Sequence, residues 1–258
     1  MCTDQTFERV SVAVMRHATI LSMSYIRPFL FYFVLAAGHV ALASETLTEI
    51  SMDDLPKPPG EVGDLIDRAN VSFRFGPRSL LGRDELDRVS NRRRRLAAET
   101  QFEMKYTYAT KTRWRIERQR QQRQLVVNVS YQTLDLNYSH DVWFRDEPSV
   151  TEFWDERLVG HELDHVRISS DPIIEKRFQD LVRQKNEFTH PIDQDTDVTK
   201  EMVRELVEDH VRGVFDQIIS LVRIRYEELD RVTDHGLRPI PPDAKASQWT
   251  RPAGKSAP

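Results

Sequence analysis

Cysteine is almost absent from this 258-residue chain, because the only one is Cys2. The rest of the chain has no cysteine and so cannot form disulfide bonds. Such a composition is compatible with any redox compartment. The same absence excludes zinc sites that take a thiolate as a ligand. Histidine and carboxylate side chains are therefore the candidate ligands for any metal site in this protein.

The sequence also lacks an excess of charge of either sign. It has 37 Lys and Arg against 41 Asp and Glu, a net charge of −4. This balance gives no overall preference for nucleic acid or for an anionic membrane, so we expect no nucleic-acid partner. Two arginine-rich runs, Arg92–Arg95 and Arg113–Arg123, are more typical of solvated helix faces and sheet edges.

Long hydrophobic runs are missing too. The longest, Phe29–Ala37, is too short for a comfortable transmembrane helix. Basic residues before it and the A-x-A pattern Ala41-Leu42-Ala43 after it are typical of an export signal. We therefore predict a signal peptide over residues 1–43, a periplasmic or secreted location, and no stable membrane insertion after cleavage. An uncleaved N-terminal anchor is the alternative.

The pentapeptide His161-Glu162-Leu163-Asp164-His165 is the feature around which the rest of the chain is interpreted. Two histidines four positions apart on a helix project from the same face, near enough to bind one Zn²⁺. Glu162 would then lie beside the open coordination position, where it can take a proton from a water molecule that the metal activates. This HExxH pattern is typical of zinc hydrolases.

The flanking sequence favours a helix around this motif. Ser149 followed by Glu152 predicts a capping box at the helix start. An apolar stripe continues from there at spacings of three and four, formed by Trp154, Leu158, His161, His165 and Ile168. The stripe places both histidines on the inward face of the helix. The alternative is a pair of buried structural histidines with a coincidental glutamate.

The remaining pattern predicts one α+β domain over residues 64–238. A proline-containing flexible lead-in precedes it at residues 44–63, and a disordered tail rich in Pro, Ala and Ser follows at 239–258. The fold that we expect is a small antiparallel sheet packed on the HExxH helix and on a long C-terminal helix, as in zincins.

The individual helices and strands are predicted from the spacing of apolar residues, which changes along the chain. We predict short helices at 64–69 and 84–99, two or three antiparallel strands from the segments 102–108, 112–117 and 125–131, a helix from Pro172 to about Lys185, a loop at 186–196, and a long helix at 198–229.

A catalytic zinc site needs a third protein ligand besides two histidines. The candidates in sequence are Asp171, Glu205 or Glu208, His210 and His235. His210 lies beside the apolar stripe of the long helix and is more typical of a packed core histidine. His235 follows the end of that helix, where Gly236 allows the chain to turn.

Two motifs together resemble a bacterial family designated secreted zinc-dependent proteases, which is largely a domain of unknown function. They are HELDHVRIS at 161–169 and LDRVTDHG at 229–236. The second is similar to the family's tyrosine-Asp-x-x-Thr-x-His-Gly signature, with Leu229 in place of the tyrosine. Ala109, Thr112, Trp114 and Ile116 also resemble a strand of that family.

The resemblance makes His235 the first choice as third zinc ligand, with Asp230 and Thr233 as groups that orient a ligand imidazole. It implies an exported zinc metallopeptidase that acts on peptides or proteins, including cell-wall peptides. Its metal ligands would be His161, His165 and His235. The alternative is a non-enzymatic exported envelope protein with a structural or vestigial metal site, closed by four protein ligands.

Overall fold

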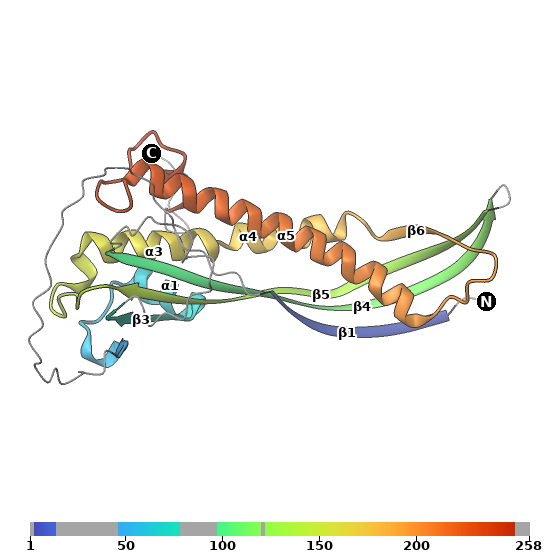
Figure 1. Cartoon of the computed structure of the whole chain (residues 1–258), viewed down its shortest axis with the longest axis horizontal. Helices are drawn as coiled ribbons and strands as arrows, with labels where there is room; N and C mark the ends of the chain where they lie inside the picture. Colours follow the sequence, from blue (N-terminus) through green and yellow to red (C-terminus); the bar gives the residue numbers. More distant parts are fainter. Residues whose placement is uncertain (1–2, 14–45, 78–96, 120–121, 251–258) are drawn as a thin grey trace, which may run out of the picture.

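The computed structural model describes residues 3–13, 46–77, 97–119 and 122–250. The strands are β1 (Thr3–Ala13), β2 (Thr48–Ile50), β3 (Val71–Phe75), β4 (Ala98–Gln119), β5 (Gln122–Phe144) and β6 (Glu187–Ile192). The helices are η1 (Met52–Asp54), α1 (Gly60–Ala69), η3 (Phe153–Asp155), α3 (Arg157–Ser169), α4 (Pro172–Arg183), α5 (Lys200–Thr233) and α6 (Ala246–Trp249). The molecule is elongated, with α5 running along the hairpin of β4 and β5 (Figure 1).

The described strands form one six-stranded sheet around the β4–β5 hairpin, in the order β1-β4-β5-β3-β2. β1 pairs antiparallel with residues 104–114 of β4. On the far edge of β5, β3 pairs in parallel with residues 140–144, and β6 pairs antiparallel with residues 123–128. The predicted antiparallel strands are confirmed as β4 and β5, with the segments 102–108 and 112–117 joined in the one strand β4. The parallel β3–β5 pair was not predicted.

The helix α5 packs against both α3 and α4, and all three helices contact the hairpin. Side chains of α3 enter two neighbouring apolar clusters: Leu163 and Val166 pack with β3, β5 and α1, and Ile168 packs with α4 and α5. Because α3 is covered in this way, its polar residues His161, Glu162 and His165 are buried as well. The inward orientation predicted for the two histidines is confirmed.

Far from α3, a buried carboxylate ties α5 to the hairpin. The hydroxyl groups of Tyr106 and Tyr108 each donate a 2.7 Å hydrogen bond to Glu208, one to each carboxylate oxygen. Glu208 is only 1% exposed, so these two donors replace the water that an ionised carboxylate needs.

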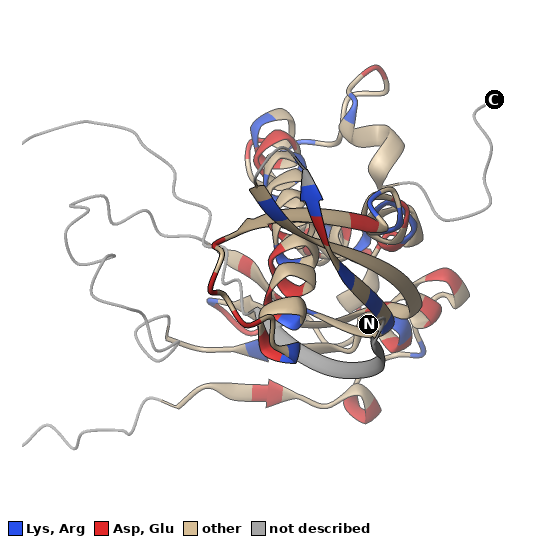
Figure 2. Ribbon diagram, turned by 90° about the vertical axis from the view of Figure 1, so that its right-hand side faces the viewer, with Lys and Arg blue, Asp and Glu red and all other residues tan. Residues whose placement is uncertain are grey.

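Lysines and arginines are interspersed with acidic residues over the described helices and strands (Figure 2).

The long helix at 198–229 and the helix that begins at Pro172 are confirmed as α5 and α4. The predicted start of the HExxH helix is wrong, because Glu156 precedes its first residue and Ser149 is separated from it by η3. The Ser149 backbone N–H instead donates a 2.6 Å hydrogen bond to the Glu156 carboxylate.

Three loop or disorder predictions also need correction. The lead-in contains β2 and η1, and Leu55 is buried beside α1. The segment 186–196 contains β6, which lies at an edge of the sheet and tolerates Pro191 there. The tail is ordered through α6, where Ala246 is fully buried against α5.

Of the predicted signal peptide at residues 1–43, the structure describes only residues 3–13. β1 lies inside the segment predicted as an export signal, so cleavage after Ala43 would remove this strand from the sheet. The apolar run Phe29–Ala37, the A-x-A pattern and most of the predicted helix at 84–99, including Arg92–Arg95, lie outside the described residues. Across the part of the chain that is described, no helix is long and apolar enough to span a membrane.

Candidate metal centre

Two histidines of α3 form one side of the centre. His161 and His165 are one helical turn apart, are 6% and 4% exposed, and have ring centroids 4.8 Å apart. Both rings turn their Nε2 atoms toward α5, which crosses beside α3. The helix period alone therefore supplies two convergent nitrogen donors, as the sequence predicted.

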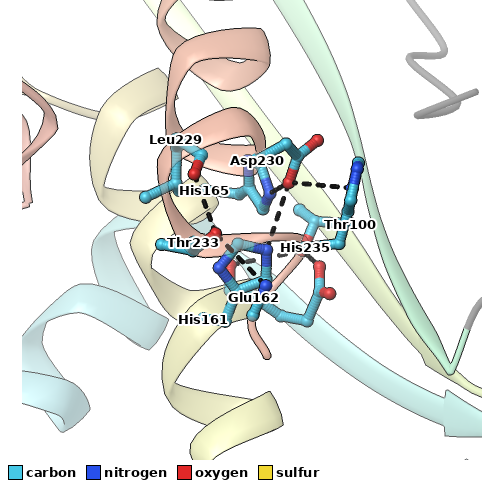
Figure 3. A network of polar contacts seen from close by, with 9 residues as sticks. Thr100, His161, Glu162, His165, Leu229, Asp230, Thr233 and His235 are labelled. Atoms are coloured by element: carbon cyan, nitrogen blue, oxygen red, sulfur yellow. Dashed lines mark hydrogen bonds and ion pairs between the residues drawn. The ribbon is translucent and has the colours of Figure 1, made fainter. Parts of the chain in front are cut away.

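Asp230, near the end of α5, supplies the third donor. Its Oδ1 atom lies 3.2 Å from His161 Nε2 and 3.0 Å from His165 Nε2. Within the described residues, these three buried side chains form a group whose ligand atoms all lie within 4.8 Å of one another. Figure 3 shows the histidines gathered around the Asp230 carboxylate. The group could hold a metal ion.

The distances from Asp230 Oδ1 to the two Nε2 atoms suit ligands of one ion. Nitrogen and oxygen ligands about 2.1 Å from a tetrahedral metal lie about 3.4 Å from each other, within a few tenths of an ångström of these two distances. The second carboxylate oxygen, Oδ2 of Asp230, is buried without a hydrogen-bond partner in the described residues. A buried carboxylate oxygen normally has a partner, and a bound ion would supply one.

The charge state of Asp230 also favours a cation. Burial opposes ionisation, but the charge of His165 and the hydrogen bonds of both histidines outweigh it and hold the pKa of Asp230 well below its usual range. The ionised carboxylate can accept an N–H from Nε2 of each histidine. A metal ion bound at these Nε2 atoms would need both of them free of a proton.

Glu162 lies beside the donors, and its side chain is held by the sheet. The hydroxyl of Thr100, on β4, donates a 2.6 Å hydrogen bond to Glu162 Oε2. Glu162 is only 4% exposed, and burial raises its pKa to about 7, although His161 and Thr100 pull it down. This carboxyl group can therefore gain and lose a proton near neutral pH.

The chain leaves α5 through a left-handed turn. Asp234, His235 and Gly236 have φ angles of 50°, 56° and 77°. A left-handed conformation costs a non-glycine residue about 1 kcal/mol, so two such residues in succession need support. The His235 N–H donates to the Asp230 carbonyl at 2.9 Å, and the Gly236 N–H donates to Thr233 Oγ1 at 3.2 Å.

This turn brings His235 to the edge of the centre. Its Nδ1 lies 3.6 Å from Asp230 Oδ1, and its side chain is 17% exposed, more than that of either other histidine. His235 is not a member of the group of His161, His165 and Asp230 that could hold an ion. Its role as a metal ligand stays a prediction.

A buried hydrogen-bonded chain supports the centre from behind. Tyr226 packs its ring on His165, with centroids 4.4 Å apart, and donates a 2.9 Å hydrogen bond to Ser169 Oγ. Ser169 Oγ lies 2.7 Å from His140 Nε2, and His140 Nδ1 lies 2.8 Å from the Ala69 carbonyl. Burial lowers the pKa of His140 to about 4, so this imidazole is neutral and connects α3 with α1.

The other predicted ligands are engaged elsewhere. Asp171 caps α4 by accepting a 2.9 Å hydrogen bond from the Ile173 N–H. His210 Nε2 lies 3.1 Å from the Val182 carbonyl. Glu208 and Glu205 precede Asp230 by more than twenty positions on the same straight helix, which places them roughly 30 Å or more along its axis.

Asp230 is the residue whose role the sequence analysis underestimated. It was predicted only to orient a ligand imidazole. One signal could have identified it: Tyr226, Leu229, Asp230 and Thr233 lie on one face of the helix, and all four are buried. A carboxylate on the apolar face of a helix needs a charged or hydrogen-bonded partner, and the two histidines provide it.

Comparisons of the chain with protein-family models, with curated proteins and with solved structures found no match. The resemblance to secreted zinc-dependent proteases stays a prediction that rests on the two motifs.

Proposed function

We propose that this protein is a zinc-dependent hydrolase of peptide bonds, with His161, His165 and Asp230 as the protein ligands of the ion. The observation that carries the proposal is the convergence of two Nε2 atoms on one carboxylate oxygen, at 3.2 and 3.0 Å, beside the buried carboxyl group of Glu162. Two imidazoles and one carboxylate are a ligand set typical of catalytic zinc sites, which keep a fourth position open.

Zn²⁺, when bound, supplies Lewis-acid activation of a water molecule and of the scissile carbonyl group. Glu162 takes a proton from the attacking water molecule and delivers it to the leaving amine nitrogen. The hydrogen bond from Thr100 fixes the direction of its carboxylate for both steps. His161, His165 and Asp230 hold their positions through the packing of α3 against α5.

The edge of β4 beside α3 is the surface that suits an extended peptide. β1 covers this edge only at residues 104–114, so residues 98–103 have no partner strand there among the described residues. Thr100, which bonds Glu162, lies in this stretch. A peptide that adds to the edge as a further strand is held by main-chain hydrogen bonds close to Glu162.

Export completes the proposal and rests on the sequence pattern of residues 16–43. An exported hydrolase of this kind would act on proteins or on cell-wall peptides. Hydrolysis measured on a library that contains both peptide classes would show which class is the substrate.

The first test compares zinc content and hydrolysis in two variants. His161→Ala should lose zinc, because it removes a ligand. Glu162→Gln should keep one zinc ion per chain and lose hydrolysis of a fluorogenic peptide library by about 1,000-fold. Glu205→Gln, at an exposed site on α5, serves as the matched control and should resemble the wild type. Full hydrolysis in Glu162→Gln would refute the mechanism.

One observation favours a second function. All three donors are at most 6% exposed, which is typical of a closed structural site. In that case the protein would be a non-enzymatic envelope protein with a stabilising ion. A hydroxamate inhibitor distinguishes the two, because it binds zinc only where a coordination position is open.

A further inference from the structure

The proposed function leaves His235 without a role, because Asp230 Oδ1 takes the place between the two histidines that a third ligand would fill. His235 nevertheless reaches the same carboxylate oxygen, at 3.6 Å. One oxygen atom is therefore approached by three imidazole rings, two from α3 and one from the turn after α5 (Figure 3).

His235 differs from the other two histidines in access to solvent. Its side chain is 17% exposed, against 5% for His161 and 4% for His165. Of the three histidines, His235 is therefore the most accessible to a ligand from solvent. The ring turns Nδ1 toward Asp230, and this leaves Nε2 on the opposite edge of the ring. At 3.6 Å the contact between Nδ1 and Asp230 Oδ1 is longer than a hydrogen bond.

The backbone around His235 fixes the position of the ring. A left-handed φ of 56° at a histidine is maintained only because hydrogen bonds and packing on both sides specify it. The Gly236 N–H bonds Thr233, and the Gly236 backbone lies against the His161 ring, where an added Cβ would stand 2.8 Å from Cγ. The turn thus couples the position of His235 to that of His161. Such preorganisation is what a donor to a developing negative charge requires.

We propose that His235 is a catalytic residue, and that its ring N–H donates a hydrogen bond to the carbonyl oxygen of the peptide bond under attack. This inference rests on the proposed function. It assigns His235 to the substrate and Asp230 to the metal. As negative charge develops on the carbonyl oxygen, the hydrogen bond strengthens, and the barrier falls without any change in metal binding.

The test uses the full chain loaded with zinc, in the wild type and three variants. His235→Ala removes the donor, and His235→Asn keeps an N–H donor and tolerates the left-handed backbone. Asp234→Asn is the matched control, since it changes a neighbouring residue whose side chain is mostly exposed and asparagine tolerates the left-handed backbone there. For each protein, the zinc dissociation constant, kcat, KM and hydroxamate affinity are measured.

In His235→Ala, zinc affinity should stay within about threefold of the wild type. Its kcat should fall about 100- to 1,000-fold, and hydroxamate affinity should fall with it. His235→Asn should recover part of both losses, and Asp234→Asn should resemble the wild type. Loss of zinc from His235→Ala would overturn the proposal and make His235 a ligand. Unchanged kcat and hydroxamate affinity would overturn it as well.

Failure of the proposed function gives a different pattern. A zinc-loaded wild type that hydrolyses no peptide would refute the peptidase, while hydroxamate affinity would still test His235. If hydroxamate then binds the wild type and His235→Ala equally, His235 is not a donor at the open position. If it binds neither, the site is closed and the role proposed for His235 is refuted.

Discussion

The backbone of Gly236 lies directly against the imidazole ring of His161: a Cβ atom at position 236 would stand 2.8 Å from Cγ and 2.9 Å from Cδ2 of that ring. The two residues are 75 positions apart in the chain, on the turn after α5 and on α3. The position of a candidate ligand therefore depends on the absence of a side chain elsewhere.

Substitution of this glycine should consequently disturb both folding and metal binding. Gly236→Ala places a methyl group against His161 and forces alanine to a φ of 77°, so we expect a loss of about 2 kcal/mol or more in the free energy of unfolding. Gly213→Ala, on an exposed face of α5 with nothing within 4 Å, should stabilise the protein by about 0.5–1 kcal/mol. Urea unfolding and zinc titration measure both effects. Equal behaviour of the two variants would contradict the packing described here.

Asp230→Asn should weaken zinc binding about 100-fold or more and leave the fold intact. Asparagine keeps an oxygen that can accept hydrogen bonds from His161 and His165, but it lacks the negative charge that a zinc ligand provides. Asp209→Asn, an exposed position on the same helix, is the control. Competition with a chromogenic chelator measures the dissociation constants, and circular dichroism checks the fold. Unchanged affinity in Asp230→Asn would remove Asp230 from the ligand set.

His140 should make the stability of the metal-free protein depend on pH. Burial lowers its pKa to about 4, whereas an unfolded histidine titrates near 6.5. Between these values the unfolded chain binds the additional proton, so stability falls as the pH decreases from 6.5 to 4, by up to about 3 kcal/mol. Above pH 6.5 the residue contributes no pH dependence. Unfolding at a series of pH values, in the wild type and in His140→Gln, isolates this contribution. Parallel curves for the two proteins would refute it.

Two substitutions at Tyr226 should separate its hydroxyl group from its ring. Tyr226→Phe removes the 2.9 Å hydrogen bond to Ser169 and should cost about 1 kcal/mol of stability, without a change in zinc affinity. Tyr226→Leu also removes the ring that packs on His165, so it should destabilise the protein by about 2–3 kcal/mol and weaken zinc binding. Thermal denaturation and zinc titration distinguish the two. A weaker zinc affinity in Tyr226→Phe would instead assign the effect to the hydroxyl.

The parts of the fold that the sequence predicts are those that local periodicity determines. His161 and His165 converge because they are four residues apart on one helix, and α5 follows from its apolar stripe. Asp230 joins them across 65–69 positions, and only the crossing of α5 over α3 decides this. No spacing in the sequence encodes that crossing.

The errors have similar causes. The strand β6 is only six residues long and contains Pro191, so its pairing with β5 depends on the partner strand as well as on propensity. Ser149 and Glu152 match a capping box, but the Ser149 N–H is bound by Glu156 instead, and the helix begins later. The parallel pairing of β3 with β5 joins segments nearly seventy residues apart and leaves no local pattern.

The near absence of cysteine bears on how a metal ion held by His161, His165 and Asp230 would stabilise the fold. An ion held by α3 and α5 joins residues 65–69 positions apart, and so acts as a reversible cross-link in a chain whose body cannot form a disulfide. Because only the folded chain assembles the three donors, free ion at about 1,000 times its dissociation constant would add about 4 kcal/mol to the stability of the whole domain. Removal of the ion would loosen the contact between two helices rather than a single loop.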